Sequence, residues 1–99
     1  MAQQLVDGRD QAFVIWEQLH SEELLKHPRF KAFNRKTCEL ILQEARNLAI
    51  KELLPTMKEG DERGVLYENG KVTVPECYHR PFSILREGDW PNLAIDPSM

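Results

Sequence analysis

The 99-residue sequence lacks the patterns that mark disulfide-rich, secreted or membrane-spanning proteins. Its two cysteines, Cys38 and Cys77, are too few for a disulfide framework, and a reducing compartment suits them. The first ten residues have neither the basic region nor the apolar region of a secretory signal. The longest unbroken apolar run is Ala12–Trp16, whereas a transmembrane helix needs roughly 20 apolar residues. We therefore expect a cytoplasmic protein without a membrane span.

An excess of positive charge is also missing. Lysine and arginine number 13, against 16 aspartates and glutamates, which gives a net charge of −3. A protein that binds nucleic acid needs a basic face to neutralise phosphates. What is present is an ordinary soluble composition, with 41% hydrophobic and 29% charged residues. This length and composition predict one small domain and no nucleic-acid partner.

Apolar residues at helical spacing predict helices at about residues 10–20, 22–27, 34–54 and 76–87. Pro81 falls inside the last of them, and proline lacks the backbone N–H that a helix interior needs. That helix therefore either starts with Pro81 in its first position or starts earlier and is kinked there. The residue that follows it is a glycine, which is a common helix stop.

Capping residues and an apolar stripe support these helices. Asp7 or Asp10 can cap the first helix, Ser21 the second and Asn34 the third. Pro55 predicts that the third helix ends near Leu54. The third helix has one apolar face over its whole length. The residues of that face are Cys38, Ile41, Leu42, Ala45, Leu48, Ala49 and Leu53.

One β-hairpin is predicted at about residues 65–74. Two short β-type runs flank Asn69-Gly70, and Asn-Gly suits a type I′ turn because both central residues need a positive φ. A lone two-stranded hairpin is marginal in water, so it must pack on the helices. The expected fold class is therefore mainly α, a small helical domain with one short β-hairpin.

The candidate metal ligands are three histidines, His20, His27 and His79, and the pattern Cys77-x-His79. Zinc needs more ligands than this pair supplies, and no second pair occurs at a usable spacing. We interpret these side chains as surface or half-buried residues and expect no metal site.

The acidic cluster Glu59, Asp61 and Glu62 is interpreted as a solvated turn. A calcium-binding loop starting at Asp61 would need oxygen ligands where Arg63 and Val65 stand. No glycine-rich phosphate loop, Walker motif or nucleophile motif occurs either. The residues alone therefore predict a helical module without reaction chemistry.

Two further pairs have a functional and a structural interpretation. Glu22 and Glu23 could form an acid/base pair, but helix capping and the helix dipole explain them more simply. Phe13 and Trp16 could form a ligand platform, but aromatic residues at helical spacing are more often part of a core.

Short motifs along the chain occur in a distinctive order. An Arg-Asp pair precedes a Phe-containing helix and Glu-x-Leu, and a long helix leads into Leu-x-Pro and Gly-Asp-x-x-Gly. Gly-x-Val-x-x-Pro and Gly-x-Trp-x-x-Leu follow. The residues of these motifs are Arg9, Asp10, Phe13, Glu17, Leu19, Leu53, Pro55, Gly60, Asp61, Gly64, Gly70, Val72, Pro75, Gly88, Trp90 and Leu93. In this order they resemble the N-terminal segment of a large, bacterial-type branch of the acyl-CoA dehydrogenases.

The resemblance implies that residues 1–99 are the N-terminal helical domain of a longer flavoenzyme. Members of this family remove the α-proton and the β-hydride of an acyl-CoA thioester, with FAD as hydride acceptor and a glutamate as base. The implied partners are the remaining domains, the acyl-CoA substrate, an electron-transfer acceptor and further copies in a homo-oligomer. Because the family's flavin contacts and base lie in later domains, we expect no catalytic, cofactor-binding or metal-binding residue here. The segment should pack on those domains, line part of the acyl pocket and be inactive alone.

The apolar stretch Trp90–Ile95 lies at the end of the sequence, and we interpret it as part of a chain that continues. Pro81 departs from the uninterrupted helix that the family pattern implies. Two alternatives remain at this stage. One is a free-standing helical interaction module that uses Phe13 and Trp16 to enter a partner's groove. The other is the N-terminal part of a DNA-damage-associated relative of the same fold.

Overall fold

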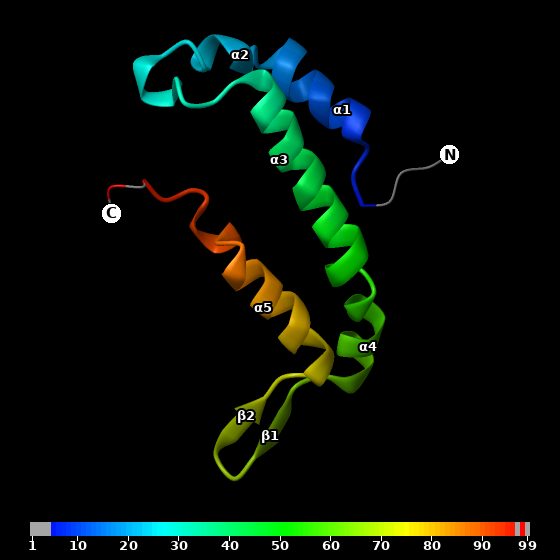
Figure 1. Ribbon diagram of the computed structural model, residues 1–99. Coiled ribbons are helices and arrows are strands. Elements are labelled where there is room, and N and C mark those ends of the chain that lie inside the picture. The colour runs from blue at the N-terminus through cyan, green and yellow to red at the C-terminus, as the bar shows by residue number, and fades with distance from the viewer. Residues whose placement is uncertain (1–4, 97, 99) are drawn as a thin grey trace. The chain divides into compact units, whose positions relative to one another are not determined.

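The computed structural model describes residues 5–96 and 98, and Figure 1 shows its ribbon. The chain divides into two compact units, Met1–Ile50 and Lys51–Met99, which we call the N-terminal and the C-terminal unit. The structure is mainly helical and contains a two-stranded antiparallel hairpin, so the predicted fold class is confirmed. No helix in the described part of the chain is long and apolar enough to cross a membrane.

The first helix of the N-terminal unit starts earlier than the predicted residue 10. It consists of α1 (Gly8–Ala12) followed by a π-helical segment, Phe13–Gln18. Asp7 is the cap, because its side chain accepts a hydrogen bond of 2.9 Å from the backbone N–H of Arg9. The helix ends before His20, which has a left-handed backbone conformation with φ of 52°.

The second predicted helix, residues 22–27, is shorter than expected. Helix α2 spans Ser21–Leu24, and a 3-10 turn at Pro28–Phe30 follows. Ser21 is its first helical residue and not its cap, since His20 occupies the cap position. Proline 28 starts the 3-10 turn, and the side chain of His27 caps that turn by accepting the backbone N–H of Arg29 at 3.1 Å.

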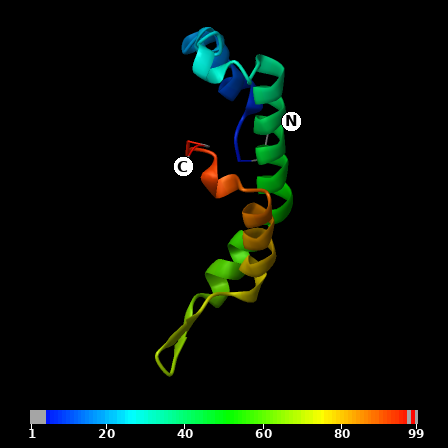
Figure 2. The same ribbon diagram turned by 60° about the vertical axis from the view of Figure 1, so that its left-hand side comes forward.

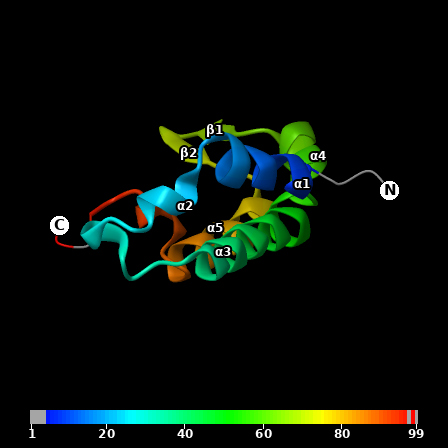
Figure 3. The same cartoon turned by 90° about the horizontal axis from the view of Figure 1, so that it is seen from above.

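The long third helix is observed where it was predicted. It comprises α3 (Arg35–Leu48) and a π-helical continuation, Ala49–Leu53. Asn34 caps it, with the Oδ1 atom accepting the backbone N–H of Thr37 at 2.8 Å. All seven residues of the predicted apolar stripe are half-buried, whereas most of the opposite face is exposed. Helix α1 lies beside α3 (Figures 1 and 3).

The prediction of a solvated turn at Glu59, Asp61 and Glu62 was wrong. These residues lie in a helix, α4 (Thr56–Arg63). The glycine at position 60 weakens the helical pattern of this segment in the sequence. Glycine lowers helix propensity by up to about 1 kcal/mol relative to alanine, so the pattern favoured a loop. The helix ends at Gly64, whose φ is 65°.

The hairpin is formed by β1 (Leu66–Glu68) and β2 (Lys71–Thr73), within the predicted range. Its register pairs Leu66 with Thr73, Tyr67 with Val72 and Glu68 with Lys71. The two turn residues between the strands both have positive φ, 51° at position 69 and 77° at position 70, as a type I′ turn requires. The hairpin projects beyond the adjoining ends of α4 and α5 (Figures 1 and 2).

The last predicted helix, residues 76–87, is a 3-10 turn at Glu76–Tyr78 followed by α5 (His79–Glu87). Pro81 is buried and lies in the first turn of α5, where backbone N–H groups have no intrahelical partner, so the helix continues through it. The glycine-stop pattern suggested a left-handed conformation at Gly88. In the structure it is Asp89, the next residue, that has this conformation. A 3-10 turn, Trp90–Asn92, follows.

Candidate functional site

The three histidines occupy exposed positions at helix ends. His20 precedes α2, His27 caps the turn after it, and His79 is the first residue of α5. Among residues 5–96 and 98, no group of three or more His, Cys, Asp or Glu side chains is placed to hold a metal ion. The structure therefore gives the Cys77-x-His79 pattern no third ligand.

Cys77 lies in a cluster that joins the Glu76–Tyr78 turn to α4. Partial burial raises the pKa of its thiol, and the nearby carboxylate of Glu59 raises it further. Glu59 in turn pairs with Arg63 at 3.3 Å. A thiol with a raised pKa stays protonated near neutral pH and is a poor nucleophile. We therefore interpret the cluster as a structural contact between the turn and α4.

Glu22 and Glu23 are each paired with a basic side chain. The carboxylate of Glu23 lies 3.1 Å from the Lys26 ammonium, and Glu22 lies 3.8 Å from the Arg35 guanidinium. Both carboxylates are exposed and stand in the first turn of α2, near the positive end of the helix dipole. This geometry supports their structural interpretation and offers no acid/base pair.

Trp16 and Phe13 have different environments. Trp16 is 8% exposed and is buried, whereas Phe13 is 54% exposed. The guanidinium of Arg35 lies over the indole ring, 5.0 Å from its centroid, and also pairs with Glu39 at 3.0 Å. Because Trp16 is covered, the two aromatic residues do not form one exposed platform, and the structure does not support a groove-entering Phe13/Trp16 surface.

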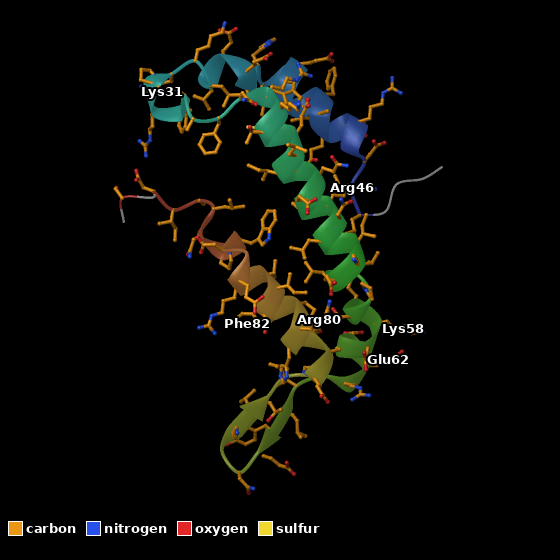
Figure 4. The ribbon with its side chains drawn as sticks, viewed as in Figure 1. Lys31, Arg46, Lys58, Glu62, Arg80 and Phe82 are labelled. Atoms are coloured by element: carbon orange, nitrogen blue, oxygen red, sulfur yellow. The ribbon has the colours of Figure 1, made fainter. Side chains whose placement is uncertain are left out.

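A hollow of about 270 Å³ adjoins Trp16 in the N-terminal unit, between the first helix and α3. The side chain of Arg46 (Figure 4) stands at this hollow and donates from Nε to the backbone oxygen of Val6 at 3.3 Å. The residues that line it are Gly8, Gln11, Ala12, Trp16, Glu39, Leu42, Gln43 and Arg46. Two of its polar side chains already bond within the protein, Arg46 to Val6 and Glu39 to Arg35.

In the C-terminal unit an ion pair connects α5 to the segment before α4. Arg80 (Figure 4) donates from Nε to Glu52 Oε2 at 3.1 Å and from Nη2 to Oε1 at 3.4 Å. These hydrogen bonds from Arg80 lower the pKa of the Glu52 carboxyl, although its partial burial opposes the shift. The pair keeps both charges satisfied and positions α5.

The C-terminal unit also has an apolar surface that the sequence analysis missed. A groove of about 450 Å³ is lined by Val74, Tyr78, His79, Phe82 and Ser83. Phe82 projects from α5 and is 64% exposed (Figure 4). The side chains of both hairpin strands are exposed as well. Tyr78 and Phe82 are four residues apart, a spacing that indicates a helix in the sequence but does not show whether the side chains are covered.

Two glycines of the recognised motifs stand where an aromatic ring approaches the backbone. A Cβ atom at Gly60 would collide with the ring of Tyr78, and one at Gly88 would lie 2.8 Å from the ring of Trp90. Pro75 of the Gly-x-Val-x-x-Pro motif is buried. Several motif residues therefore have packing roles in this fold, and none of these contacts involves reaction chemistry.

Comparison with known proteins identifies a distant relative. The chain is 26% identical over 93 residues to the broad-specificity linear acyl-CoA dehydrogenase FadE5 of Mycobacterium tuberculosis. The alignment covers 92% of this chain, and the chain spans about 15% of the length of that protein. No protein-family profile and no solved structure matches the chain. This similarity supports a distant relationship to an acyl-CoA dehydrogenase.

Proposed function

We propose that this chain is the N-terminal helical domain of an FAD-dependent acyl-CoA dehydrogenase, a packing domain that is inactive alone. The observation that carries this proposal is the alignment of nearly the whole chain with a small part of a much longer acyl-CoA dehydrogenase. The ordered motifs of the sequence, from Arg9-Asp10 to Trp90, point to the same family. The intact protein then dehydrogenates acyl-CoA thioesters at the α and β carbons.

The exposed apolar residues support a packing role. Large exposed apolar surfaces are rare on soluble monomers and mark interfaces. In the C-terminal segment, Leu93 is 64% exposed and Ile95 is also exposed. We propose that these side chains, with the apolar face of α3, contact the remaining domains of the intact protein and contribute to a wall of the acyl pocket.

We propose that the described residues do not bind FAD. A flavin dinucleotide needs backbone N–H groups at a glycine-rich turn or helix start for its pyrophosphate. The groove of the C-terminal unit is lined mainly by apolar side chains, and in the hollow beside Trp16 the side chains of Arg46 and Glu39 already bond within the protein. We therefore propose that other parts of a cytoplasmic parent protein bind the flavin and the electron-transfer acceptor and carry the base.

The isolated chain should bind no FAD and oxidise no acyl-CoA. Titrating it into FAD while following flavin fluorescence should give no saturable change, and dye reduction with acyl-CoA substrates should stay at the rate without protein. The intact mycobacterial relative is a suitable positive control. Stoichiometric flavin binding or turnover by the isolated chain would contradict the proposal, because it would place the site within these 99 residues.

A further inference from the structure

The turn of the hairpin lies at its tip and is open to solvent (Figure 1). Asn69 and Gly70 are both exposed, and both have positive φ. A Cβ atom at Gly70 would have no neighbour within 4 Å, so space remains around its backbone nitrogen. Among the hydrogen bonds of residues 5–96 and 98, none uses the N–H of Gly70. The turn therefore leaves this nitrogen free to react.

We propose that Asn69 is a site of spontaneous deamidation, with the backbone nitrogen of Gly70 as the nucleophile. The nitrogen attacks Cγ of the Asn69 side chain, and the new N–Cγ bond replaces the Cγ–Nδ2 bond. The proton of the Gly70 N–H leaves with Nδ2 as ammonia, and the product is a succinimide ring. Glycine favours this step because it has no Cβ to hinder the close approach of its own nitrogen.

The other three asparagines, Asn34, Asn47 and Asn92, are held in ways that oppose this reaction. The side chain of Asn34 is engaged as the cap of α3. Asn47 lies within α3, where helical hydrogen bonds fix the backbone nitrogen of the next residue. The N–H that follows Asn92 donates to the Trp90 oxygen at 3.2 Å. Each of the three also precedes a residue with a Cβ atom, so only Asn69 is followed by a nitrogen that is both free and unhindered.

Water opens the succinimide in two ways. Attack at Cγ breaks the new bond and gives an aspartate with the original backbone. Attack at the backbone carbonyl of residue 69 breaks the peptide bond to Gly70 and gives isoaspartate, whose chain continues through Cβ and Cγ. The turn then contains one additional backbone atom. Because a two-residue type I′ turn sets the strand register, this atom disrupts the pairing of the strands, which begins with Glu68 opposite Lys71.

The hairpin has little to oppose this change. Its strands are three residues each, and all their side chains are exposed. A two-stranded hairpin is marginal in water. The reaction needs only water and proceeds without an enzyme, so the age of the protein sets the fraction of chains with a paired hairpin. This inference concerns the hairpin alone and does not depend on the proposed function.

The test uses the asparagines of one chain as mutual controls. The 99-residue chain is aged at mildly alkaline pH, and peptide mapping by mass spectrometry measures at each asparagine the mass increase that exchange of an amino group for a hydroxyl produces. A protein isoaspartyl methyltransferase labels the isoaspartate, and NMR amide shifts of β1 and β2 report strand pairing. Gly70→Ala places a methyl group beside the reacting nitrogen, whether or not the turn stays closed. Asn69→Asp introduces the same charge as deamidation without the additional backbone atom.

We expect deamidation at Asn69 to be at least about tenfold faster than at any other asparagine, and Gly70→Ala to slow it by a similar factor. Aged chains that carry isoaspartate should lose the paired hairpin, whereas the fresh Asn69→Asp variant should keep it, because Asp-Gly suits the same turn. The proposal would be overturned if Asn69 reacted no faster than Asn34, Asn47 and Asn92, or if Gly70→Ala left its rate unchanged. Isoaspartate in a chain with intact strand pairing, or loss of pairing in the fresh Asn69→Asp variant, would overturn it too.

Discussion

The Trp16→Ala variant should lose about 3 kcal/mol of unfolding free energy, enough to leave the N-terminal unit partly unfolded. Trp16 is the one buried large hydrophobic side chain among residues 5–96 and 98. Its removal leaves a cavity between the first helix and α3. It also leaves Arg35 without the ring on which its guanidinium lies at 5.0 Å. Urea unfolding followed by far-UV circular dichroism measures the loss.

Phe13→Ala is the matched control for this effect. Phe13 belongs to the same helical segment, but its side chain is 54% exposed, so its removal should cost well under 1 kcal/mol. Equal losses in the two variants would contradict the environment that the structure gives Trp16. The comparison also decides between the core and the ligand-platform interpretation of these aromatic residues.

The Gly60→Ala variant should lose about 1–3 kcal/mol of unfolding free energy, although alanine is the better helix former. Gly60 is buried within α4, and an added methyl group collides with the ring of Tyr78. Either the ring or the helix must then move, which separates the Glu76–Tyr78 turn from α4. Chemical unfolding of the variant measures this cost.

A double-mutant cycle identifies the cause of that loss. In a Tyr78→Ala background the ring is gone, so Gly60→Ala should instead raise the unfolding free energy by up to about 1 kcal/mol through helix propensity. The sign of the effect therefore reverses between the two backgrounds. A loss of the same size in both would show that the Tyr78 ring does not determine the need for glycine at this position.

Local signals were sufficient to predict much of the fold. Asn34 was identified as a cap because its side chain needs only the next helical turn, and Asn69-Gly70 was identified as a turn because positive φ at both residues is a local requirement. The apolar stripe of α3 was visible from its spacing alone. In each case the interaction that fixes the structure lies within a few residues.

The features that were missed depend on contacts between distant residues. Helix α4 was interpreted as a turn because Gly60 weakens the local pattern, and the reason for the glycine is Tyr78, eighteen positions away in the sequence. Likewise, Phe13 and Trp16 have equivalent positions in a helical pattern, and the structure shows that Trp16 is the buried one, with Arg35 over its ring. The exposure of the hairpin strands was missed because a sequence shows which side chains are apolar, but not whether anything covers them.

The coding sequence downstream of Met99 tests the central claim most directly, because a packing domain of an acyl-CoA dehydrogenase requires the rest of that enzyme. We expect the reading frame to continue into several hundred residues that carry the later domains, with the flavin contacts and the glutamate base. A stop codon immediately after Met99 would contradict the account and favour a free-standing interaction module.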